Sequence, residues 1–204
     1  MQANQFTDEL EKAEEMIQNA QNIVVISHRN PDGDTLGANI SLSEILRSHF
    51  GKRVTSVCID PLPSSLRFLP GSAGFRTNFG LENIDLIIIV DCGSLNQTRF
   101  NEKIAEAFEK NISIINIDHH PSNEYFGTLN IVMPKTAATC EIIYYFARHL
   151  NANISKSMAT ALLTGLYTDT GSFMHSNTTE AVYQIAAHLM GLGANFKHIV
   201  KYIF

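Results

Sequence analysis

The sequence predicts an α/β fold: a three-layer αβα sandwich with a mostly parallel sheet and a helical C-terminal part. Two observations carry this prediction. Short aliphatic runs alternate with stretches of helical periodicity as far as residue 132, and only helical periodicity follows. The aliphatic runs also lack polar alternation, which is typical of strands covered on both faces in a parallel sheet.

As far as residue 80 the elements follow in order. Apolar side chains recur at helical spacing in 7–21, and a β-branched run at 23–26 predicts the first strand. A second helix is expected at 35–49 and a second strand at 54–59. The stretch 61–80 is interrupted by Gly, Pro and Ser and is expected to be a long loop.

The aliphatic run at 86–90 is the clearest strand pattern in the sequence. We expect a helix at 97–110 after it, and further strands at 112–117 and 129–132. The remaining helices share apolar residues three and four positions apart, and we expect them at 137–150, 156–167, 179–191 and 195–204.

Composition narrows the class of protein. Hydrophobic residues make up 45% of the 204 residues, enough for a sizeable core in one domain that spans 1–204. The formal net charge of −5 argues against a surface that binds long nucleic acid. No apolar run is long enough to span a membrane, and the N-terminus does not resemble a secretory signal. Three cysteines without metal-ligand spacing indicate a reducing, cytoplasmic location.

His28, Asp32 and Asp34 follow the first predicted strand in an irregular turn that contains Pro31 and Gly33. Such a turn can fold the three side chains back over the end of the strand. Imidazole and carboxylate ligands together suit Mn²⁺, Co²⁺, Fe²⁺ or Zn²⁺ better than Mg²⁺. The alternative is a polar loop with an Asx-turn.

Two further carboxylates stand at the ends of apolar segments. Asp91 comes directly after 86–90, where an unpaired carboxylate is costly; the alternative role is a cap for the next helix. Asp169 ends an apolar helix, where the helix dipole disfavours a negative charge unless a cation is near. Both residues are therefore candidate metal ligands.

Asp118, His119 and His120 follow the fourth predicted strand. One histidine can bind a metal ion while its neighbour donates a hydrogen bond to a phosphate, and Asp118 can orient an imidazole. Arg99 lies on the segment after Asp91, where it can reach a phosphate; a solvated arginine is an equal alternative.

Together these segments resemble the DHH phosphoesterase family, which is named for the motif at 118–120. The resemblance rests on four motifs in order: SHRNPDGD at 27–34, Asp91, DHHP at 118–121 and TDTGSF at 168–173. It implies two divalent cations, the first held by His28 and Asp32, the second by Asp34, His119 and Asp169, and both bridged by Asp91. It also implies that His120 contacts the substrate phosphate, which makes Asp91, Asp118 and His120 the expected catalytic residues.

The bacterial branch with the most similar motifs degrades oligonucleotides a few residues long and dephosphorylates 3′-phosphoadenosine 5′-phosphate. The resemblance therefore implies a hydrolase of such phosphoesters, with Mn²⁺ as the first expected ion and Co²⁺, Fe²⁺ or Mg²⁺ as alternatives. The expected partner is a small nucleotide or very short oligonucleotide, and an oligomer is compatible with the sequence.

Members of that branch usually continue into a smaller C-terminal substrate-binding domain, and we expect this domain to be absent from the chain. Two alternative functions remain open. One is an inorganic pyrophosphatase or polyphosphatase that uses the same metal ligands. The other is a truncated module that binds metal but has little specific activity.

Overall fold

The computed structural model describes residues 2–203, with side chains described from residue 6 onward. Within this part of the chain, five strands form one parallel sheet in the order β2-β1-β3-β4-β5. The strands are β1 (Asn22–Ile26), β2 (Arg53–Val57), β3 (Leu86–Val90), β4 (Ser113–Asp118) and β5 (Leu129–Val132). The predicted parallel sheet is confirmed, and β3 and β5 have the predicted bounds.

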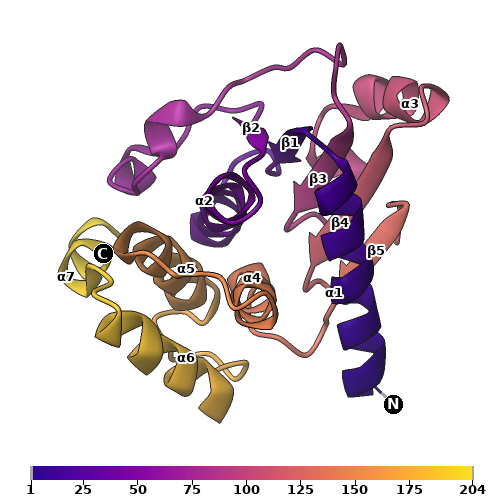
Figure 1. Ribbon diagram of the computed structural model, residues 1–204. Coiled ribbons are helices and arrows are strands. Elements are labelled where there is room, and N and C mark those ends of the chain that lie inside the picture. Colours follow the sequence, from indigo (N-terminus) through magenta and orange to yellow (C-terminus); the bar gives the residue numbers. More distant parts are fainter. Residues whose placement is uncertain (1, 204) are drawn as a thin grey trace.

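The helices lie in layers on the two faces of the sheet (Figure 1). They are α1 (Gln2–Asn19), α2 (Gly33–Ser48), α3 (Asn101–Glu109), α4 (Thr139–His149), α5 (Lys156–Asp169), α6 (Glu180–Gly191) and α7 (Phe196–Ile203). Helices α1, α2 and α4 share one apolar cluster with one face of the sheet, and α3 packs on the other face. Helices α5, α6 and α7 lie beyond α2 and α4, so the predicted sandwich carries an additional outer helical layer.

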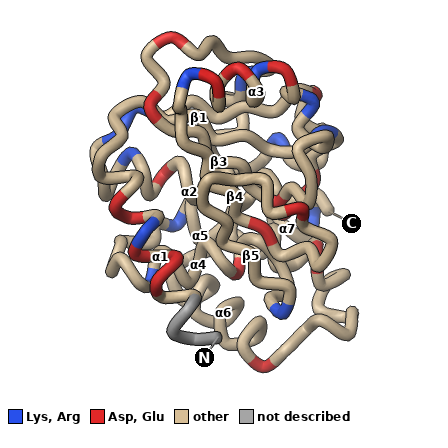
Figure 2. The backbone as a smooth tube through the Cα atoms, turned by 90° about the vertical axis from the view of Figure 1, so that its right-hand side faces the viewer, with Lys and Arg blue, Asp and Glu red and all other residues tan. Residues whose placement is uncertain are grey.

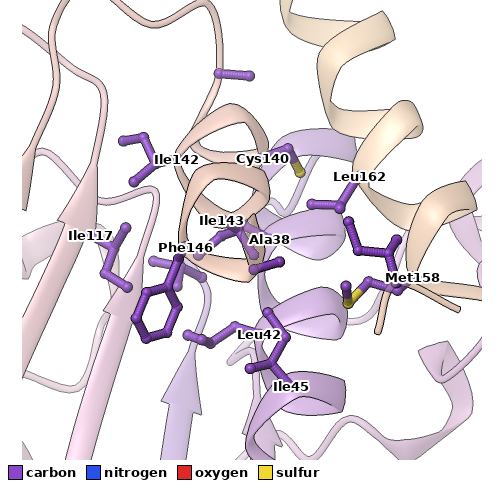
Figure 3. Close-up of a cluster of buried hydrophobic side chains, with 14 of the residues drawn as sticks. Ala38, Leu42, Ile45, Ile117, Cys140, Ile142, Ile143, Phe146, Met158 and Leu162 are labelled. Carbon is purple, nitrogen blue, oxygen red and sulfur yellow. The ribbon is translucent and has the colours of Figure 1, made fainter. Parts of the chain in front are cut away.

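The main core lies between the sheet, α2 and α4. Figure 3 shows Phe146 of α4 beside Leu42 of α2 and Ile117 of β4. All three side chains are at most 3% exposed. Burying an aliphatic or aromatic side chain of this size stabilises the fold by about 1.5–3 kcal/mol, so this cluster fixes the position of α4 against α2.

Two glycines allow α2, α4 and α5 to approach one another closely. A Cβ atom at Gly37 in α2 would lie 2.5 Å from the carbonyl oxygen of Ala161 in α5. A Cβ atom at Gly165 in α5 would lie 2.3 Å from Sγ of Cys140 in α4. Only a residue without a side chain fits at such distances, because protein interiors are close-packed.

The predicted helix boundaries differ from the structure by up to five residues, the largest difference being the start of α1 at Gln2 instead of residue 7, and the starts of α2 and α3 have a clear local cause. Helix α2 begins two residues earlier than expected, because Oδ1 of Asp32 caps it by accepting hydrogen bonds from the backbone N–H groups of Asp34 and Thr35, each at 3.0 Å. Helix α3 begins at Asn101 instead of residue 97. Arg99 has a φ of +60°, a left-handed conformation that interrupts the helical path.

The register of the sheet brings three segments of the chain to one edge. Ile26 of β1 pairs with Ile89 of β3, and Ile89 pairs with Asn116 of β4. Two positions beyond these paired residues stand His28, Asp91 and Asp118. Since the strands are parallel, all three emerge at the carboxyl edge of the sheet, the usual position of a ligand site in such folds.

Basic and acidic residues alternate on the face that carries α1, α3 and β5 (Figure 2). No helix in residues 2–203 combines the length and the apolar character that crossing a bilayer requires. Cys58, Cys92 and Cys140 are buried free thiols.

Candidate active site

His28 faces two carboxylates from different segments. Its Nδ1 lies 2.6 Å from the carbonyl oxygen of Arg29, so Nδ1 donates there and Nε2 points inward. Nε2 lies 3.7 Å from Oδ2 of Asp32 and 3.4 Å from Oδ2 of Asp91. Burial lowers the pKa of His28, but the two carboxylates outweigh it and raise the pKa to about 11.

Asp34 is fully buried in the first turn of α2. Its Oδ2 accepts a hydrogen bond of 2.6 Å from the backbone N–H of Thr139, and its Oδ1 accepts one of 2.9 Å from that of Cys140. These N–H groups begin α4, whose dipole favours a negative charge at that end. Even so, burial and the nearby charges of Asp91 and Asp169 raise the pKa of Asp34 well above its usual value.

Asp91 stands at the centre of the site. It has a φ of +60°, which is uncommon for a residue other than glycine, and its side chain is buried. Oδ1 lies 3.7 Å from Nε2 of His119 and 3.8 Å from Nδ1 of His120, while Oδ2 faces His28. Oδ1 also accepts a 3.0 Å hydrogen bond from the Thr139 hydroxyl. One carboxylate therefore lies between histidines from two segments.

His119 carries a buried nitrogen whose hydrogen bonding is unsatisfied. Its Nδ1 lies 3.4 Å from the carbonyl oxygen of Thr136. Its Nε2 lies 3.2 Å from Oδ2 of Asp169 and 4.0 Å from Oδ2 of Asp34, but it forms no well-aligned hydrogen bond within the described residues. Burial lowers the pKa of His119, but Asp169, Asp34 and Asp91 outweigh it and raise the pKa to about 10.

A series of buried hydrogen bonds through Asp118 and Asn123 orients the His120 ring. Its Nδ1 lies 2.7 Å from Oδ1 of Asp118, which raises the pKa of His120. Asn123 donates a 2.6 Å hydrogen bond to Oδ2 of Asp118, and Asn116 donates one of 2.9 Å to Asn123. Asp118 is fully buried, yet the hydrogen bonds from His120 and Asn123 outweigh burial and lower its pKa.

The structure brings together all six of the predicted metal ligands. Three sets of side chains have ligand atoms within 4.8 Å of one another: His28, Asp32 and Asp91; Asp34, His119 and Asp169; and Asp91, His119 and His120. Nε2 of His119 points inward and is buried without a hydrogen-bond partner in the described chain, and a bound metal ion would satisfy it. The donor set of imidazole nitrogen and carboxylate oxygen thus fits divalent ions of the Mn²⁺ type.

Asp118 and Arg99 are the predicted site residues that lie outside these groups. Asp118 holds His120, and Arg99 lines an open cavity together with Arg29 and the first turn of α3. Two residues of the site were not predicted to act there: Thr139, which holds Asp34 and Asp91, and Asn123, which holds Asp118. Neither residue type marks a functional site by itself, so only the fold identifies them.

Comparisons with known proteins place the chain among phosphoesterase-like sequences. The family model described as "DHH family, N-terminal domain" matches residues 22–166. The chain is 34% identical over 178 residues to the bifunctional oligoribonuclease and PAP phosphatase NrnA of Thermus thermophilus, covering 87% of this chain and 52% of that protein. The protein of the same description from Bacillus subtilis is 26% identical over 176 residues, covering 82% of this chain and 52% of that protein.

A solved structure has the same fold. The chain superimposes on an exopolyphosphatase-related protein from Bacteroides fragilis with a TM-score of 0.89 and 25% identity, covering 97% of this chain and 60% of the other. The chain spans about half the length of the curated relatives that it matches.

Proposed function

This chain belongs to the DHH family, and from that premise we propose that it is a two-metal phosphoesterase. The observation that carries the proposal is the position of Asp91, whose two carboxylate oxygens face histidines of separate segments at 3.4 Å and 3.7 Å. A carboxylate in this position would serve as a ligand to two neighbouring cations, and two neighbouring cations are the arrangement that two-metal hydrolysis of phosphoesters uses.

We assign the ligands by the sets that the geometry forms. His28 and Asp32 would hold one divalent cation, and Asp34, His119 and Asp169 would hold the other. Asp91 would contribute to both sites. Mn²⁺ is the ion that we propose first, because the ligands mix nitrogen and oxygen donors. In the metal-free chain, the neighbouring carboxylates raise the pKa values of His28 and His119, so both imidazoles keep a proton that partly balances the carboxylate charge.

The mechanism assigns separate tasks to the side chains. When bound, the cations would supply Lewis acidity toward the phosphoryl oxygens and would lower the pKa of water. Asp118 raises the pKa of His120, and the protonated ring donates from Nδ1 to Asp118 and from Nε2 to a phosphoryl oxygen. Asp118 keeps His120 in this orientation and favours its protonated form, while Asn123 in turn holds Asp118.

The proposed substrates are very short oligonucleotides and 3′-phosphoadenosine 5′-phosphate. The names of the relatives support both, because those proteins are described as oligoribonuclease and PAP phosphatase. The charge balance also supports a small substrate, since basic and acidic residues are interspersed along the backbone in Figure 2 and the formal net charge is −5.

The test is a substrate panel with Mn²⁺ and with EDTA. The panel contains 3′-phosphoadenosine 5′-phosphate, a dinucleotide, pyrophosphate and bis(p-nitrophenyl) phosphate. We expect metal-dependent release of products from the first two. Asp91→Asn should lower kcat by at least roughly a hundredfold, whereas Asp8→Asn, an exposed aspartate of α1, should leave kcat unchanged.

Near-normal turnover by Asp91→Asn would contradict the assignment of the bridging ligand. Turnover of pyrophosphate alone would favour the pyrophosphatase alternative. Turnover of the aryl phosphodiester alone would indicate a competent metal centre without a pocket for nucleotides.

A further inference from the structure

A polar cavity adjoins the candidate active site at the carboxyl edge of β1 and β3. Its volume is about 520 Å³, and its lining includes Arg29, which follows β1, and Arg99, which follows β3. The first turn of α3 completes it. None of the six proposed metal ligands lines this cavity, so it is a separate feature of the same edge.

The two arginines carry unused hydrogen-bonding capacity. Both are exposed, and neither guanidinium group forms a hydrogen bond or an ion pair with the described residues. By contrast, the ammonium group of Lys103 in the same cavity is bound to the carbonyl oxygen of Phe79 and the side chain of Asn78. Glu102 is the single carboxylate in the lining, so the cavity has a net positive charge within a chain of net charge −5.

A backbone hydrogen bond connects the two segments that line the cavity. The N–H of Arg29 donates a 2.8 Å hydrogen bond to the carbonyl oxygen of Gln97, which joins the segments after β1 and β3. His28, the neighbour of Arg29, faces Asp91 at 3.4 Å. Arg29 therefore directly follows a proposed metal ligand, and a backbone hydrogen bond joins its segment to the segment that carries Arg99.

The proposed substrates need such a second cationic site. 3′-Phosphoadenosine 5′-phosphate carries one phosphate besides the one that is hydrolysed. A dinucleotide carries a second phosphate when its 5′ end is phosphorylated. Guanidinium groups bind phosphate through two parallel hydrogen bonds and keep their charge at every physiological pH.

We propose that Arg29 and Arg99 form a subsite for the substrate phosphate that is not hydrolysed. The inference rests on the proposed function, because it assumes that the neighbouring centre hydrolyses nucleotide phosphoesters. The subsite makes the enzyme favour substrates with two phosphates, such as a 5′-phosphorylated dinucleotide, over the same dinucleotide without the 5′-phosphate.

The test compares those two dinucleotides in steady-state kinetics with Mn²⁺. The double variant Arg29→Gln and Arg99→Gln should raise KM for the 5′-phosphorylated dinucleotide roughly a hundredfold, because each lost guanidinium contact is worth about tenfold. The loss on the dinucleotide without the 5′-phosphate should be at least tenfold smaller. Equal losses on the two substrates would overturn the subsite.

A matched control removes the same charge elsewhere. Arg53→Gln with Arg148→Gln takes two exposed arginines from the far side of the molecule, at the start of β2 and the end of α4. This variant should leave both substrates unaffected. If it raises KM for the 5′-phosphorylated dinucleotide as much as the first double variant does, general electrostatic attraction explains the effect and the subsite is refuted.

A binding measurement separates this inference from the proposed function. Calorimetric titration of EDTA-treated protein with the 5′-phosphorylated dinucleotide requires no turnover. We expect the double variant Arg29→Gln and Arg99→Gln to bind at least tenfold more weakly than the control variant. Equal affinities would refute the subsite even if the chain hydrolyses nucleotides, and a tenfold loss would support it even if the chain hydrolyses none.

Discussion

Gly165→Ala tests whether the packing of α5 against α4 sets the metal site. The added Cβ atom would lie 2.3 Å from Sγ of Cys140 and 2.6 Å from Oδ1 of Asp34. Overpacking of this kind costs about 1–3 kcal/mol, and the better helix propensity of alanine offsets about 1 kcal/mol. The expected net loss is at most about 2 kcal/mol, or up to roughly 8 °C in the unfolding midpoint of a chain this size.

The same change should weaken metal binding, because Asp34 cannot keep both its place and its hydrogen bonds to α4. We expect the Mn²⁺ affinity, measured by isothermal titration calorimetry, to fall by at least roughly tenfold. Gly191→Ala is the matched control. It is the same substitution in α6, where a Cβ atom meets nothing within 4 Å, and it should leave metal binding unchanged and stability equal or higher.

A second substitution separates the effect of the contact with Cys140 from the effect of the contact with Asp34. Adding Cys140→Ala to Gly165→Ala removes the sulfur but leaves the contact with Asp34. Stability should then recover in part, while metal affinity stays low. The reasoning is refuted if Gly165→Ala melts and binds Mn²⁺ as Gly191→Ala does.

Three further predictions concern the same site. Mn²⁺ binding at pH 8 should release roughly two protons, because the pKa values of His28 and His119 are raised to about 11 and about 10 and both imidazoles must lose a proton to bind metal. The proton release is measured as a dependence of the calorimetric heat on the buffer. In EDTA these raised pKa values contribute stability that is complete below the ordinary histidine pKa of 6.5 and is lost as pH rises through 10 to 11. The melting temperature should therefore fall as pH rises from 6.5 to 11, and a flat profile would contradict this prediction. Thr139→Val should weaken Mn²⁺ binding roughly tenfold by removing the 3.0 Å hydrogen bond to Asp91, with an unchanged affinity as the opposing result. Asn123→Ala should lower kcat on bis(p-nitrophenyl) phosphate more than it changes Mn²⁺ affinity, because Asn123 holds Asp118 and not a proposed metal ligand; equal losses in both would show a merely structural role.

The sheet and its reactive edge could be predicted from local patterns. The aliphatic run at 86–90 predicted β3, and the polar residues after three strands predicted side chains at one edge. Such patterns are reliable because a buried strand requires an uninterrupted apolar run, and parallel strands end on the same side. The resemblance to a known family then gave each of these residues an expected role.

Helix boundaries were less well predicted, since caps and local backbone conformation set them. Asp32 was expected as a metal ligand, yet its Oδ1 also caps α2 and so begins that helix early. The left-handed conformation of Arg99 moves the start of α3 to a later residue, and an arginine gives no indication of a positive φ.

The sequence by itself determined the order of strands and helices, the residues at the strand ends and the kinds of ligand available. Only the tertiary structure decided that Asp34 meets the backbone of Thr139, 105 residues away, and that Asp169 at the end of α5 comes within 3.2 Å of His119. The reason is physical: periodicity reports which face of an element is buried, but not which distant element covers it. That choice depends on close packing through Gly37 and Gly165, whose missing side chains leave no local pattern.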